Sequence, residues 1–225
     1  MDSLLDSVRS PADLRKLNAT QMRQLAAEVR QLIIEVVARN RKNAIDNPNA
    51  HIKGDFSVDE MLEEPYLSSP LRKSFCPPLS DSAAAVVLAA GDAAKKLVKR
   101  PAWIRGIDHR TEPHALGQRD LTLSPSAKLA AEKAGVGKGK IDVAELHAPF
   151  AHQELILREA MGLGDGVRVN PSGGALAANS LMTAGLIRFG EAASRVLSGD
   201  ADRALAHTTN GVCLQHNLVA VLEGE

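Results

Sequence analysis

The chain has 225 residues, of which 44% are hydrophobic and 24% are charged, so it can bury a core as one large domain or as one domain with an appendage. Lysine plus arginine equals aspartate plus glutamate at 27 each, which argues against a net field that attracts nucleic acid or an anionic membrane. Two cysteines, no run of 18 apolar residues and no secretory leader predict a cytoplasmic protein without a disulfide framework or a membrane span.

The first 82 residues divide into two predicted segments. Residues 1–39 carry apolar side chains at helical spacing, which predicts a helical leader of one or two helices, the second beginning near Asn18 or Thr20. Residues 40–82 are rich in Asn, Pro and Ser and predict an irregular loop region. One short helix is expected there, because Ser57 and Glu60 have the spacing of a capping box.

Strand and helix patterns alternate from residue 83 to residue 225. Apolar runs predict strands and amphipathic spacing predicts helices. The predicted strands are 83–90, 102–108, 141–146, 167–169, 203–208 and 214–222, and the predicted helices are 92–99, 126–134, 150–161 and 176–197. This alternation predicts an α/β domain with a mostly parallel sheet, helices on both faces, an antiparallel final pair of strands, and ligands beyond the strand ends.

The segment from Asn170 to Asn179 is the first candidate site. Gly173 and Gly174 let backbone N–H groups approach a ligand closely, and the start of the predicted helix favours an anion or oxyanion. A plain strand-to-helix turn explains the same glycines equally well.

His147 is the second candidate, because it follows the predicted strand 141–146. An imidazole at a strand end can donate to a developing oxyanion or hold a water, since its ordinary pKa lies near neutrality. A structural histidine held by hydrogen bonds is the alternative.

Cys213 and His216 form the third candidate, a thiol and an imidazole three residues apart. A thiolate near a cation can act as nucleophile or as acid and base. On an extended strand these two side chains face opposite sides, so they pair only if the segment bends. Cys213 can equally be a small buried apolar residue. His109 and His114 have no ligands at metal-site spacing, and we predict no metal.

Four motifs, taken together and in order, resemble the thiolase superfamily. They are Arg41-Lys42-Asn43-Ala44 with Asn47-Pro48, the stretch Cys76–Ala85, the His147–Phe150 segment, and the Asn170–Gly174 loop. Within the superfamily the likeness is to the C-terminal half of actinobacterial thiolase-like proteins, which are called lipid-transfer proteins or acetyl-CoA acetyltransferases. It covers about residues 38–225.

The resemblance implies the C-terminal half of a thiolase-like fold, with a mostly parallel five-stranded sheet. It also implies a coenzyme A thioester as substrate, no permanently bound cofactor, and cleavage or formation of a carbon–carbon bond. The partners implied are a second copy of the chain or a thiolase-type subunit. Ser80 and Asp81 are placed by the resemblance on the coenzyme A side of the site.

The resemblance also implies roles for single residues. His147 matches a position that lines an oxyanion hole, together with Asn170, Gly173 and Gly174, and His216 belongs to the substrate side. Where the family has Gly-His-Pro, this chain has Ala178-Asn179-Ser180, so Asn179 replaces the activating histidine. The family's acid/base cysteine aligns with Gly211, so Cys213 is displaced from that position by two residues.

The nucleophilic cysteine of thiolases lies in their first half, which we expect this chain to lack. Two functions follow: an impaired thiolase-like acyltransferase, or a truncated and catalytically inactive subunit that binds acyl-CoA. A retro-aldolase is a third possible function. The tyrosines that such a reaction would use are lacking, because Tyr66 is the only tyrosine in the sequence.

Residues 1–37 resemble something else, the start of 1-deoxy-D-xylulose-5-phosphate synthase. The likeness ends before any cofactor-binding residue of that enzyme, so we expect no thiamine diphosphate site.

Overall fold

A computed structural model describes residues 3–224; residues 1–2 and 225, at the ends of the predicted segments 1–39 and 83–225, lie outside the described residues. The α-helices are α1 (Leu4–Ser7), α2 (Pro11–Leu14), α3 (Ala19–Asn43), α4 (Val58–Glu63), α5 (Gly91–Leu97), α6 (Pro125–Ala134), α7 (Ala151–Ala160), α8 (Gly174–Ala177) and α9 (Ala184–Leu197). The strands are β1 (Tyr66–Ser68), β2 (Leu71–Arg72), β3 (Trp103–Thr111), β4 (Val143–Leu146), β5 (Arg168–Val169), β6 (Arg203–Asn210) and β7 (His216–Glu223). Short 3₁₀ helices cover Lys73–Phe75, Leu116–Gln118 and Val136–Lys138.

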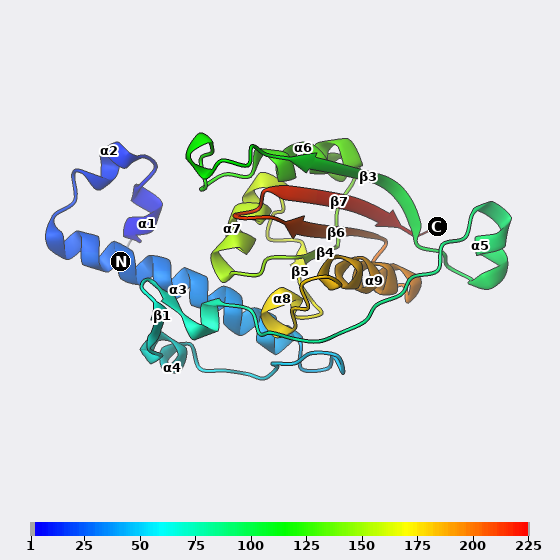
Figure 1. Ribbon diagram of the computed structural model, residues 1–225, viewed down its shortest axis with the longest axis horizontal. Helices are drawn as coiled ribbons and strands as arrows, with labels where there is room; N and C mark the ends of the chain where they lie inside the picture. The colour runs from blue at the N-terminus through cyan, green and yellow to red at the C-terminus, as the bar shows by residue number, and fades with distance from the viewer. Residues whose placement is uncertain (1–2, 225) are drawn as a thin grey trace.

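The long helix α3 begins where the sequence predicts. The side chain of Asn18 accepts from the backbone N–H of Gln21, and Gln21 bonds back to the backbone of Asn18. The second half of the helix packs on the rest of the chain, with Ile34 and Val37 fully buried. The first half, with α1 and α2, extends away from the sheet (Figure 1). The helix is continuous across residue 39, the predicted end of the leader, and within residues 3–224 no helix is long and apolar enough to cross a membrane.

The main sheet has five strands in the order β3-β7-β6-β4-β5. β4 pairs in parallel with both β5 and β6, whereas β7 pairs antiparallel with both β6 and β3. The α/β class and the five strands are confirmed. The prediction of a mostly parallel sheet holds only for half of the pairings, because β3 joins the outer edge of β7 in the antiparallel sense instead of extending the parallel set.

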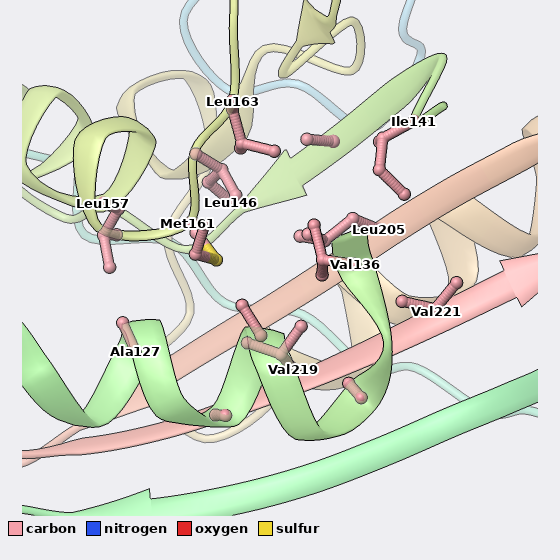
Figure 2. Packing of buried hydrophobic residues seen from close by; sticks show 14 of the residues in the cluster. Ala127, Val136, Ile141, Leu146, Leu157, Met161, Leu163, Leu205, Val219 and Val221 are labelled. Atoms are coloured by element: carbon pink, nitrogen blue, oxygen red, sulfur yellow. The ribbon is translucent and has the colours of Figure 1, made fainter. Parts of the chain in front are cut away.

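Helices cover both faces of this sheet, as predicted. Alternating side chains of β4, β6 and β7, including Leu146, Leu205 and Val221, point into a core with α6 and α7 (Figure 2). The residues between them, including Val143 and Leu222, pack on the other face against α9. Burial on two faces explains why these strands read as nearly continuous apolar runs in the sequence.

The predicted strand at 83–90 is wrong. The segment is extended but has no neighbouring strand, and it leads to α5 at the far end of the molecule from the N-terminus (Figure 1). Val87 is 89% exposed and Leu88 is 71% exposed. An apolar run can occupy a strand only where another strand offers its hydrogen-bonding edge, and a run of residues does not reveal that edge.

The predicted continuous helix 176–197 is also wrong, because it is split into α8 and α9. Between them, the backbone N–H of Ser80 donates to the carbonyl oxygen of Asn179 at 3.1 Å, and the N–H of Asn179 donates to the Ser80 hydroxyl at 3.2 Å. Bonds to the loop region thus replace the bonds that would have continued the helix.

Candidate functional site

Asn170, directly after β5, connects three elements. Its backbone is left-handed, with φ at +49°, a conformation that asparagine tolerates better than most residues. Its side-chain oxygen accepts from the N–H of Leu146 at 2.6 Å, and its amide nitrogen donates to the carboxylate of Glu154 at 2.8 Å. Glu154, fully buried in α7, also accepts from Asn40 and Arg39 of α3. The loop is therefore tied to β4, α7 and α3 at once.

A second buried carboxylate supports the same loop from the other side. Glu145 of β4 has no exposed surface, and it accepts from the N–H and the hydroxyl of Ser172 at 3.0 and 2.6 Å. Arg188 of α9 donates to Glu145 at 2.9 Å and to the Ser172 hydroxyl at 2.7 Å. Burial raises the pKa of Glu145, while Arg188 and Ser172 oppose that rise.

The paired glycines lie between these two supports. Gly173 has φ at +98°, and a Cβ there would lie 2.5 Å from the Cβ of Ala44. Its N–H donates to the carbonyl of Asn170 at 2.9 Å, and the N–H of Gly174 faces the Ser172 hydroxyl at 3.4 Å. Since α8 has only four residues, these amides do not open the long helix that the sequence predicts.

A cavity of about 610 Å³ adjoins the loop. Asn47, Ser80, Asp81 and Gly174 line it, so three of the four motifs that are far apart in the sequence meet at one hollow. Its other lining residues are Asn49, His51, Leu79, Ser82, Ala83, Ser172, Ala178, Ser180, Ile187, Arg188 and Glu191. Volumes of a few hundred to about 1,000 Å³ are typical of small-molecule sites.

His147 lies behind this cavity and does not line it. The side chain is 5% exposed, with Nδ1 3.1 Å from the carbonyl oxygen of Thr209 and Nε2 3.1 Å from Oδ1 of Asn179. Burial lowers the pKa of this imidazole. Ala178 and Ser180, on either side of Asn179, do line the cavity, so Asn179 connects His147 to the wall of the cavity.

The structure does not bring Cys213 or His216 to this cavity. Cys213 is exposed with φ at +53°, so it is not a small buried apolar residue, and its carbonyl accepts from Arg119 at 3.1 Å. His216 stacks on His109 with ring centroids 6.0 Å apart. Within residues 3–224, Cys213 and His216 share no hydrogen bond, and no group of His, Cys, Asp or Glu is arranged to hold a metal.

Sequence reasoning missed Glu145, Glu154 and Arg188. Two signals were present: a carboxylate inside the apolar strand that ends at Leu146, and a charged residue within a helix whose other face is apolar. A buried charge needs a partner, and which partner it finds depends on the tertiary fold.

His207 of β6 is a buried histidine beside this site, and it makes the fold sensitive to acid. Burial lowers its pKa from 6.5 to about 4. The His207 side chain of the unfolded chain therefore takes up a proton below pH 6.5, whereas that of the folded chain does not until about pH 4. The contribution of neutral His207 to the free energy of unfolding is complete above pH 6.5 and is lost as the pH falls between these values. The difference corresponds to roughly 3 kcal/mol.

We expect urea unfolding from pH 7 to pH 4.5 to show this loss, and we expect His207→Gln to have a shallower dependence on pH than the unmodified chain. Glutamine retains a polar group opposite Asn217 but does not titrate. Equal slopes for the two proteins would show that His207 is not the group responsible.

The fold is the α/β fold of thiolases. The monomeric SCP2-thiolase-like protein type 1 of Mycobacterium smegmatis superimposes with a TM-score of 0.67 at 20% identity, over 88% of this chain and 46% of that chain. The Ltp2-ChsH2(DUF35) aldolase superimposes with a TM-score of 0.68 at 19% identity, over 86% and 58% of the two chains.

The sequence relatives are thiolases and sterol carrier protein 2. Benzoylsuccinyl-CoA thiolase subunit BbsB of Thauera aromatica is 32% identical over 62% of this chain and 38% of its own length. Sterol carrier protein 2 of Oryctolagus cuniculus is 29% identical over 80% of this chain and 38% of its own length. The predicted resemblance to the thiolase superfamily is thereby confirmed, and the chain spans well under two thirds of these relatives.

The N-terminal residues match a different family, described as 1-deoxy-D-xylulose-5-phosphate synthase, over residues 5–44. This confirms the predicted likeness of the leader. The match covers the whole of α3, including Asn43, whose side-chain amide donates to the carbonyl oxygen of Asn170 at 3.1 Å.

Proposed function

We propose that this chain is a thiolase-like protein that binds acyl-CoA thioesters in the 610 Å³ cavity and takes part in breaking or forming a carbon–carbon bond. The observation that carries the proposal is the meeting of Asn47, Ser80–Asp81 and Gly174 at that cavity, in a chain whose relatives include a benzoylsuccinyl-CoA thiolase subunit. No permanently bound cofactor forms part of the proposal.

The cavity wall suits the polar parts of such a ligand. Hydroxyls and amides of Ser80, Ser82 and Asn49 offer donors and acceptors to the amides of a pantetheine arm. Arg188 is paired with Glu145, so its charge is compensated within the protein. We assign the thioester end to Gly174 and the Ala178–Ser180 wall, with His147 behind it.

A partner subunit is the second part of the proposal. Neither Cys76 nor Cys213 lines the cavity, so acyl transfer to a cysteine of this chain has no support in the geometry. The name of one structural neighbour joins two components, Ltp2 and ChsH2(DUF35). We propose that turnover needs a thiolase-type subunit or a second copy of this chain, and that the chain alone binds acyl-CoA without turnover. The free thiols suit a reducing cytoplasm.

A thiolysis assay tests the proposal. The purified chain is incubated with acetoacetyl-CoA and coenzyme A, alone and with a co-expressed thiolase-type subunit. Release of acetyl-CoA only in the mixture supports the proposal that turnover needs a partner subunit. No release in either case, with binding retained, favours an inactive acyl-CoA-binding subunit. No binding and no release refute both.

We expect His147→Ala to weaken acetyl-CoA binding at least tenfold in calorimetry, because it removes the side-chain support of the Ala178–Ser180 wall. His152→Ala is the matched control, since His152 is a partly buried histidine of α7 that does not line the cavity. Unchanged affinity in His147→Ala would contradict the assignment.

A further inference from the structure

Two buried histidines, His147 directly after β4 and His207 in β6, each face the side-chain amide of an asparagine. Nε2 of His147 lies 3.1 Å from Oδ1 of Asn179, and Nε2 of His207 lies 2.9 Å from Oδ1 of Asn217. A neutral imidazole has one N–H donor and one nitrogen with a lone pair. The hydrogen-bond partners of Nδ1, and the other partners of the asparagine amide, decide whether Nε2 or Nδ1 holds the proton. These partners differ between the two pairs.

At His147 the proton must be on Nδ1. Nδ1 lies 3.1 Å from the carbonyl oxygen of Thr209, which can only accept a hydrogen bond. Within residues 3–224 no carboxylate bonds to the ring, and the nearby positive charge of Arg188 adds to burial in disfavouring a second proton. Nε2 is therefore left with a lone pair.

A lone pair at Nε2 requires a donor, and the Asn179 amide supplies one after a half-turn about its terminal bond. This turn exchanges Oδ1 and Nδ2, so that Nδ2–H points at Nε2. The side chain of Asn179 has no other hydrogen bond among the described residues, so the exchange breaks none.

At His207 the same reasoning gives the opposite tautomer. The amide nitrogen of Asn217 donates to the carbonyl of Leu214 at 2.8 Å and to the hydroxyl of Ser126 at 2.7 Å. Since the Leu214 carbonyl can only accept, the amide is fixed with Oδ1 toward His207. Nε2 of His207 must hold the proton, and its Nδ1 is buried without a partner.

We infer that His147 is a positioning residue, which accepts a hydrogen bond from the Asn179 side chain at Nε2 and so holds the wall of the cavity formed by residues 178–180. Ser80 holds the same wall from the other side, through two hydrogen bonds to the backbone of Asn179. His147 then acts on a ligand through Asn179 and is not itself a donor to an oxyanion. The use of the cavity rests on the proposed function, whereas the tautomers do not.

Nuclear magnetic resonance of the full chain with ¹⁵N-labelled histidine tests the tautomers directly. Long-range ¹H–¹⁵N spectra at pH 7 should show His147 protonated at Nδ1 and His207 protonated at Nε2, so each ring is a control for the other. The signals are assigned from His147→Gln and His207→Gln. A proton on Nε2 of His147, with or without one on Nδ1, overturns the inference.

Two variants of Asn179 test the contact itself. Asn179→Asp places a carboxylate that cannot donate against Nε2, so the imidazole should gain a proton, and its affinity for that proton should rise at least tenfold in an NMR titration. Asn179→Ala removes the N–H that stabilises the Nε2 lone pair, so it should also raise this affinity, but by less than Asn179→Asp, which adds a negative charge. An unchanged titration in Asn179→Asp overturns the inference.

Hydrogen exchange reports on the wall. The amide of Ser80, which donates to Asn179, should exchange at least tenfold faster in His147→Ala and at the unmodified rate in His152→Ala. Equal Ser80 rates in all three proteins overturn the positioning role. A chain with the expected tautomers that fails to bind acetyl-CoA keeps this inference and refutes the proposed function.

Discussion

Replacing Arg188 with methionine is expected to lower the free energy of unfolding by about 3–5 kcal/mol. The reason is that Glu145, with no exposed surface, would keep its two bonds to Ser172 but lose its ion pair with Arg188. An uncompensated carboxylate in the core either stays charged at high cost or takes up a proton. Equilibrium unfolding in urea measures the loss.

The loss should shrink as the pH falls from 8 toward 5. In Arg188→Met the pKa of Glu145 rises further above its usual value, so acid supplies the proton that neutralises it. The double variant Glu145→Gln with Arg188→Met should be more stable than Arg188→Met alone, because it leaves no buried charge.

Arg195→Met is the matched control. Arg195 also lies in α9, but its partner Asp200 is at the surface, 3.2 Å away, and such pairs contribute about 0–1 kcal/mol. If Arg188→Met and Arg195→Met cost the same, the buried pair does not support the glycine loop as described.

Substitution of Gly173 by alanine should destabilise the chain by about 3 kcal/mol or more, from two causes. Its φ of +98° is strained for any residue with a Cβ. The added Cβ would also lie 2.5 Å from Ala44 and 2.7 Å from Ala177, which forces α3 and α8 apart. Both the midpoint temperature of thermal unfolding and the affinity for acetyl-CoA should fall.

Gly199→Ala separates these two causes. Gly199 has φ at +78°, but a Cβ there meets nothing within 4 Å, so only backbone strain of about 1–2 kcal/mol is expected. Gly173→Ala should cost clearly more than Gly199→Ala. Equal losses in the free energy of unfolding would mean that the loop around Gly173 can move away from α3 without destabilising the chain.

The parts of the fold that depend on local signals were predictable. The helices predicted at 126–134 and 150–161 differ from α6 and α7 by at most one residue at either end, since each is amphipathic and bounded by clear signals. The antiparallel pairing of the last two strands, β6 and β7, was predicted, whereas the direction of β3 was not, because β3 and β7 pair through contacts that no short window contains.

The candidate site was predictable only in part. Ser80, Asp81 and Gly174 line one cavity, as a resemblance in several motifs suggests, but the sequence does not show that His147 lies one residue behind that wall. Whether a polar side chain faces a ligand or another side chain depends on rotamers set by packing. The roles assigned to Asn170, Cys213 and His216 stay predictions.

The uncovered run from Ala83 to Ala90 bears on the behaviour of concentrated solutions. Eight small or apolar residues without a charge or a proline, extended and with unpaired backbone amides, form a segment that can stack against its own copies. Asp81 and Asp92 flank it, and their repulsion between molecules opposes such stacking in register. Salt screens that repulsion, so the chain should stay dispersed best at low ionic strength.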